Sequence, residues 1–236
     1  MQTDNPVLRE GYFDRAAGDS MAIEGVINRC FIMLIMLVAA AVPAWQATGA
    51  RGAIIIGGAL IGLGLALATI FMPDYAYVTA PLYAIAEGAF LGAFTAVLEA
   101  QYPGIAIQAL LLTTGVFFVM LTLYRSGTIV VTDRLRSGIV AATGAILLVY
   151  VISFVGRLFL GASIPFIHEG GPLGIVFSLV VVGVAAFNLL LDFDFIERMA
   201  EKNADKKYEW MGAFGLIVTL VWLYIEILIL LSKLRR

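Results

Sequence analysis

The sequence has one cysteine, one histidine and few charged residues, and each scarcity excludes a class of protein. Cys30 has no second cysteine with which to form an intrachain disulfide, and its apolar segment indicates the role of a small hydrophobic residue. Charged residues make up 14% of the 236 residues and hydrophobic residues 61%, too little polarity to cover the surface of a soluble protein. The net charge is −2 and no basic stripe is present, which excludes nucleic acid as an expected partner. We expect a polytopic membrane protein in a lipid bilayer.

Seven apolar runs are each long enough to cross a bilayer, which takes about 20 residues as a helix. Because the runs are continuous rather than alternating, β-strands are excluded as the spanning elements. The runs cover residues 27–47, 52–72, 78–99, 105–124, 138–162, 172–193 and 209–232. The sequence therefore predicts an all-α bundle of seven transmembrane helices, one domain over residues 23–236. Residues 1–22 are expected to form a cytoplasmic N-terminal tail. They carry acidic and basic residues before any apolar run, whereas a signal peptide has a positively charged start that leads directly into an apolar region.

Lysine and arginine indicate the orientation, because cytoplasmic loops carry an excess of them. With a cytoplasmic N-terminus, ten such residues fall on the cytoplasmic side and four on the other. The ten are Arg9, Arg15, Arg29, Arg125, Arg134, Arg136, Arg198, Lys202, Lys206 and Lys207, and the four are Arg51, Lys233, Arg235 and Arg236. The distribution favours a cytoplasmic N-terminus.

Small residues spaced four apart predict where helices approach each other closely. The pairs are Gly58 with Gly62, Gly88 with Gly92, and Gly170 with Gly174. Such pairs let backbones meet where lipid offers no hydrophobic drive for association, so we interpret them as packing positions in a compact bundle.

Ionisable residues inside apolar runs are costly and are therefore candidates for function. Glu87 and Glu226 have no charged neighbour in sequence, so each must find a partner, hold a proton or face water. Arg157 is expected to extend toward the interface. Asp192 and Asp194 point about 200° apart on a helix, so only one of them faces the bundle. Solvation at a helix end explains Asp194, and Asp192 is the inward candidate.

Enzymatic activity is not expected. An aspartyl intramembrane protease needs a Gly-x-Gly-Asp motif, which the sequence lacks, and the histidine, His168, stands in a loop after Ser163 rather than inside a run. A retinal protein needs a lysine midway along its last helix, whereas Lys233 stands at the end. A proton-coupled transporter would show internal repeats or paired helix breaks, and neither is clear.

Four segments resemble, in the same order, segments of the Bax inhibitor-1 family, which includes the YccA-like proteins. They are AIAEGAFLGAF in the third run, QALLLTTGVFFVMLTLYRSG in the fourth, LDFDFIE at the end of the sixth and LYIEILILLSKL in the seventh. The resemblance covers residues 20–236 and is strongest to the bacterial branch. It implies a seven-helix bundle with the last helix central, in the bacterial inner membrane.

The resemblance also implies a pH-sensitive calcium leak channel, without a resident cofactor, gated by two carboxylates from the sixth and seventh helices. These fall on Asp192 and Glu226, which also become the candidate ligands of a calcium ion. Glu226 stands where better-known members have aspartate, and the two residues are 34 apart, a longer interval than is usual in the family. The family's bacterial channel has an arginine in the second helix, but here only Arg51 stands at its edge, so Arg157 becomes a candidate substitute.

A second function class stays open from the sequence, namely a membrane protein that conducts nothing. In that interpretation the buried acids are structural. The basic connection around residues 202–207 and the N-terminal tail would then bind a membrane protease or a stress-response partner.

Overall fold

The computed structural model describes residues 20–160 and 171–236. The predicted tail of residues 1–22 lies almost wholly outside these residues, as do Ser163, His168 and Gly170. The long helices are α2 (Ile23–Gln46), α3 (Arg51–Phe71), α4 (Ala76–Gln101), α5 (Ile105–Arg125), α6 (Asp133–Leu160), α8 (Pro172–Glu201) and α9 (Tyr208–Leu234), and a short 3₁₀ turn, η2 (Pro73–Tyr75), precedes α4. Within this part of the chain, seven helices are long and apolar enough to cross a membrane, which confirms the all-α seven-span prediction.

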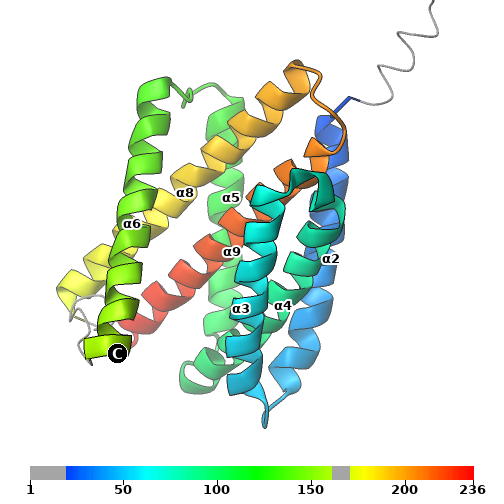
Figure 1. The fold of residues 1–236 in the computed structure, drawn as a ribbon. Helices are drawn as coiled ribbons and strands as arrows, with labels where there is room; N and C mark the ends of the chain where they lie inside the picture. Colours follow the sequence, from blue (N-terminus) through cyan, green and yellow to red (C-terminus); the bar gives the residue numbers. More distant parts are fainter. Residues whose placement is uncertain (1–19, 161–170) are drawn as a thin grey trace, which may run out of the picture.

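The last helix lies at the centre of the bundle, as predicted. α9 packs against α2, α4, α5 and α8, and Figure 1 shows it crossing obliquely between them. α3 is peripheral and packs mainly on α4, while α6 packs mainly on α8. The side chains of α9 therefore meet protein along most of its length, and the outer helices present apolar residues to lipid.

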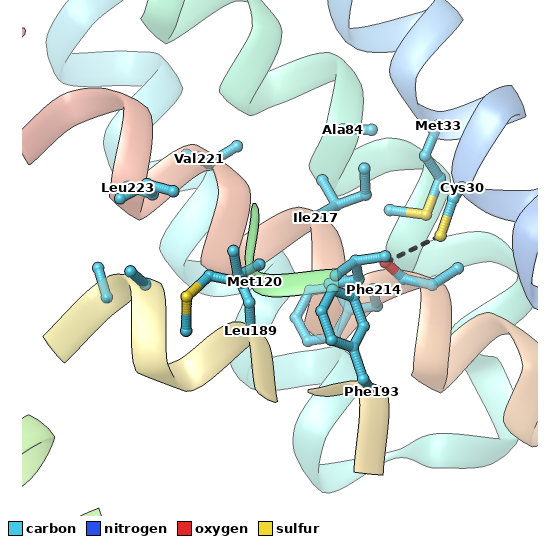
Figure 2. Close-up of a cluster of buried hydrophobic side chains, with 14 of the residues drawn as sticks. Cys30, Met33, Ala84, Met120, Leu189, Phe193, Phe214, Ile217, Val221 and Leu223 are labelled. Carbon is cyan, nitrogen blue, oxygen red and sulfur yellow. Dashed lines mark hydrogen bonds between the residues drawn. The ribbon is translucent and has the colours of Figure 1, made fainter. Parts of the chain in front are cut away.

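The core forms where α9 meets α2, α5 and α8. Figure 2 shows its side chains converging, with the Cys30 thiol directed at the Ala213 carbonyl oxygen at 4.0 Å. Leu189, Ile217 and Leu223 are fully buried. The labelled members are Cys30 and Met33 of α2, Ala84 of α4, Met120 of α5, Leu189 and Phe193 of α8, and Phe214, Ile217, Val221 and Leu223 of α9. Cys30 thus has the hydrophobic surroundings predicted for it.

Among the described glycines, Gly88 and Gly92 of α4 lie closest to the backbone of a neighbouring helix. A Cβ atom on Gly88 would overlap the backbone of Leu37, and one on Gly92 would overlap the backbone of Ala41. Both partners are on α2, one turn apart. The two helices therefore cross with backbones in contact, as the spacing of four predicts.

Hydrogen bonds place the start of the described chain and three connections on one face of the bundle, and the bond from Arg198 Nη2 to the Val131 carbonyl brings the α5–α6 connection to this face. It is here called the N-terminal face (residues 20–22, 72–75, 126–132 and 202–207). The Met21 N–H donates to the Ala204 carbonyl at 2.7 Å. Lys207 Nζ donates to Asp74 Oδ1 at 2.6 Å, and this bond raises the pKa of Lys207 above its ordinary value. On the opposite face, Arg235 Nη1 donates to the Pro103 carbonyl at 2.9 Å. The helices therefore alternate in direction through the bundle.

Candidate functional site

Asp192 lies on α8 and turns toward α9. Its carboxylate accepts a hydrogen bond from the Thr219 hydroxyl, and its Oδ1 atom lies 3.5 Å from the place a Cβ on Gly215 would take. The missing side chain of Gly215 leaves room for the acid between the two helices. The Oδ2 atom is buried and has no hydrogen-bond partner among the described residues. An acid in this position has one oxygen free for a proton or a cation.

Glu226 lies on α9 and is 2% exposed. Its Oε1 atom accepts hydrogen bonds from the Tyr150 hydroxyl of α6 at 2.8 Å and from Trp222 Nε1 at 3.2 Å. Its Oε2 atom is buried without a hydrogen-bond partner in the described part of the chain. Glu226 thus repeats the arrangement at Asp192, in which one oxygen is held by neutral donors and the other is not.

Lys233 is a buried cation two turns beyond Glu226 on α9. It is 4% exposed, and its Nζ donates to the Gly174 carbonyl at 3.1 Å and to the Ser178 hydroxyl at 2.8 Å. Both acceptors lie on the first turns of α8. The ammonium also lies 6.0 Å from the centre of the Phe177 ring. Neutral acceptors and an aromatic ring stabilise the charge at this end of the bundle.

The two candidate acids lie apart along α9. Asp192 is level with Thr219, and Glu226 is seven residues further on, about 10 Å of helix rise. The cause is the α8–α9 connection, which lies between Glu201 and Tyr208. A turn at this position pairs Asp192 with the first half of α9 in an antiparallel hairpin. Two carboxylates this far apart do not share a proton, so the two acids that the resemblance implies as gates are separate groups here.

The prediction that Asp194 is solvated at a helix end is wrong. The apolar run ends near residue 193, but α8 continues to Glu201, more than two turns further. Asp194 is 8% exposed and forms ion pairs with Arg136 of α6 and with Arg198 one turn later on α8. The buried acid is neutralised by two guanidinium groups and ties α6 to α8.

Glu87 is half-buried on α4 and packs on Gly62 of α3. Its Oε1 atom lies 2.5 Å from the position that a Cβ on Gly62 would take. The prediction that Gly58 and Gly62 are packing positions agrees with this contact, because a Cβ on Gly58 would lie 2.9 Å from Phe90 Cβ. The missing side chain of Gly62 leaves room for the Glu87 carboxylate.

Replacing Gly62 with alanine is expected to lower the free energy of unfolding by about 1 kcal/mol, because the Glu87 carboxylate must move away. The same change in a Glu87→Ala background should cost nothing, since the overlapping atoms are gone. Thermal unfolding in detergent measures both. Gly64→Ala is the matched control on α3, where an added Cβ meets no atom within 4 Å. Equal effects of Gly62→Ala with and without Glu87 would contradict this contact.

Arg157 is exposed near the end of α6, as expected of a side chain that extends to the interface. It does not replace the family's second-helix arginine at Glu226. The residue of α6 that bonds to Glu226 is Tyr150, two turns before Arg157.

The start of α9 holds an ion pair that was not predicted from the sequence. Glu209 is 2% exposed, pairs with Arg29 of α2 and accepts a hydrogen bond from the Ala22 N–H at 3.0 Å. Its carboxylate occupies the space beside Gly25, and the Arg29 guanidinium lies 5.2 Å from the centre of the Trp210 ring. The pair was not predictable from the sequence, because Glu209 follows the highly charged connection of residues 201–207 and resembles a solvated residue at a helix end.

The described residues include no cluster of three or more His, Cys, Asp and Glu side chains arranged to hold a metal ion.

A family model described as Bax inhibitor 1 like matches residues 5–236, nearly the whole chain. No curated protein and no solved structure matches the chain.

Proposed function

The chain belongs to the Bax inhibitor-1-like family, and from this premise we propose that it is a pH-sensitive calcium leak channel. In this proposal Asp192 and Glu226 act as two separate acids along α9 rather than as one proton-sharing pair. The protein is an integral membrane protein. We further propose the bacterial inner membrane as its location and a cytoplasmic N-terminal face, from the excess of lysine and arginine on that side.

The observation that carries this proposal is the pair of unpartnered oxygens inside a transmembrane bundle. Asp192 Oδ2 and Glu226 Oε2 are both buried without a hydrogen-bond partner in the described chain. A charged or polar atom left in this state is costly, and natural membrane proteins retain such groups mainly on ion and proton pathways.

The chemistry follows from competition between protons and calcium for the same atoms. An ionised carboxylate offers hard oxygen ligands that suit calcium, and a protonated one does not. At Glu226 the Tyr150 hydroxyl and the Trp222 N–H already hold one oxygen, so the second takes the proton or the cation. At Asp192 the Thr219 hydroxyl has the equivalent role. Conductance in this scheme depends on pH at two depths of the bundle.

Calcium flux into dye-loaded proteoliposomes, measured between about pH 6 and about pH 8, tests the proposal. We expect a pH-dependent flux for the native chain, and a reduced pH dependence for Asp192→Asn and for Glu226→Gln. Because the two acids lie about 10 Å apart along the helix axis, their effects on the logarithm of the flux should add in the double variant. Glu201→Gln, which changes an exposed carboxylate at the end of α8, is the matched control.

Two results would contradict the proposal in different ways. If each single substitution removes all pH dependence, the acids act as a coupled pair, and if only one of them does, that acid is the sole sensor; the two-site arrangement is wrong in both cases. If well-folded protein gives no flux at any pH, the leak itself is wrong. That second result would favour the alternative proposal, a non-conducting protein that binds a membrane protease or a stress-response partner through residues 202–207.

A further inference from the structure

A cavity of about 490 Å³ opens on the N-terminal face, between the α5–α6 connection and the last turns of α8. It is separate from Asp192 and Glu226. Its lining combines the end of α5 (Tyr124 and Arg125), the connection (Gly127 and residues 129–131) and three charged residues of α8 (Asp194, Glu197 and Arg198). The cavity therefore lies where two transmembrane helices end, at the level at which lipid headgroups meet the protein.

The carboxylates of this cavity are already engaged. Asp194 is paired with Arg136 and Arg198, and Glu197 accepts a hydrogen bond from the Tyr124 hydroxyl. Both acids therefore have partners within the protein, and the charge of Asp194 is compensated by two guanidinium groups.

The donors of the cavity, by contrast, are not all engaged. The Arg125 side chain has no hydrogen bond or ion pair within the described residues. Val131 is 5% exposed, and although its carbonyl accepts from Arg198 Nη2 at 3.4 Å, its N–H donates to no atom of the described chain. A backbone N–H that has no partner within the protein leaves a donor that a ligand in the cavity can accept from. A guanidinium and a backbone N–H together form a recurrent donor set for phosphate oxygens.

The surroundings of the cavity distinguish a lipid phosphate from a phosphate free in water. Val130, which also lines the cavity, is 66% exposed. A ligand with its phosphate at Arg125 thus finds apolar protein surface directly beside it, which suits an amphipathic molecule and not an inorganic ion.

We propose that this cavity binds the phosphodiester headgroup of an anionic phospholipid, with Arg125 and the Val131 N–H as its donors. The site is a property of the bundle and does not depend on whether the chain conducts calcium.

Native mass spectrometry of the full chain in detergent, titrated with phosphatidylglycerol or with phosphatidylcholine, tests this site. We expect the native chain to retain phosphatidylglycerol in preference to phosphatidylcholine, and Arg125→Gln to lose most of that preference. Arg125→Lys should retain an intermediate preference, because an ammonium keeps the charge but not the planar fork of donors. Lys206→Gln is the matched control, since Lys206 is an exposed cation of the same face that does not line the cavity.

The outcomes separate the possible ligands. Equal retention of the two lipids by the native chain, or equal loss of preference in Arg125→Gln and Lys206→Gln, would overturn the site. Displacement of bound phosphatidylglycerol by millimolar inorganic phosphate would assign the cavity to the free anion and overturn the lipid assignment. Unfolding temperatures in lipid-free detergent, unchanged among the variants, would show that a lost preference is a loss of binding and not of fold.

Discussion

Replacing Glu209 with alanine is expected to lower the free energy of unfolding by about 3–5 kcal/mol, because the change leaves the Arg29 guanidinium against a buried surface without its counter-ion. The Ala22 N–H loses its acceptor at the same time, and a space opens beside Gly25. Glu209→Gln should cost less, since an amide oxygen still accepts from Ala22. Chemical or thermal unfolding of the detergent-solubilised chain measures the loss.

Two comparisons separate the buried pair from a general effect of charge. Glu24→Ala removes an exposed acid from the first turn of α2, and we expect it to cost under about 1 kcal/mol. The double change Arg29→Met with Glu209→Leu replaces both charges by apolar groups and should recover much of the loss. A Glu209→Ala variant as stable as the Glu24→Ala variant would show that the Arg29–Glu209 ion pair contributes nothing to the free energy of unfolding.

Replacing Gly88 with alanine is expected to lower the free energy of unfolding by about 3 kcal/mol or more, because the added methyl group meets the backbone of Leu37. A side chain could rotate away from such an overlap, but a helix backbone cannot. α2 must therefore move away from α4 along the whole crossing. Thermal unfolding and the yield of monodisperse protein both report the effect.

Gly115→Ala is the matched control for Gly88→Ala. Gly115 also lies within a transmembrane helix, but a Cβ there meets no atom within 4 Å. We expect this variant to be as stable as the native chain or more stable, since alanine favours helix over glycine by about 1 kcal/mol. If the two variants unfold alike, the close crossing of α2 and α4 is not present in solution.

The helices were predictable because lipid imposes a simple rule on them. A chain that crosses a bilayer must satisfy its backbone internally, so long apolar runs become helices whatever their side chains. The close approach at Gly88 and Gly92 was predictable for a related reason, since a spacing of four puts both glycines on one face.

The helix ends were less predictable, and Asp194 is the clearest consequence. Apolar composition marks where a helix enters lipid, but not where it stops. α8 continues from residue 193 to Glu201 because Arg136 and Arg198 compensate the acid within it. Arg136 belongs to another helix, 58 residues away in sequence. A single sequence does not reveal which of several distant arginines will meet a given aspartate.

The candidate acids were also predictable only in part. Asp192 and Glu226 were identifiable as charges in apolar runs, but their partners were not. Tyr150 is an ordinary aromatic residue of an apolar helix until the fold places its hydroxyl at Glu226. Lys233 was placed at the end of the last run and counted with the residues on the non-cytoplasmic side, yet the start of α8 covers it with Gly174 and Ser178.

The central position of α9 sets an order for assembly during synthesis. Among the described helices α9 leaves the ribosome last, yet α2, α4, α5 and α8 all pack on it. α2, α3 and α4 pack on one another and have the contacts to associate early in the bilayer. α5 and α8 contact each other and the early helices, and α6 packs on α8, but the centre of the bundle is filled only when α9 inserts and brings Glu209 to Arg29. A nascent chain that ends before residue 208 would therefore carry Arg29 without its counter-ion Glu209.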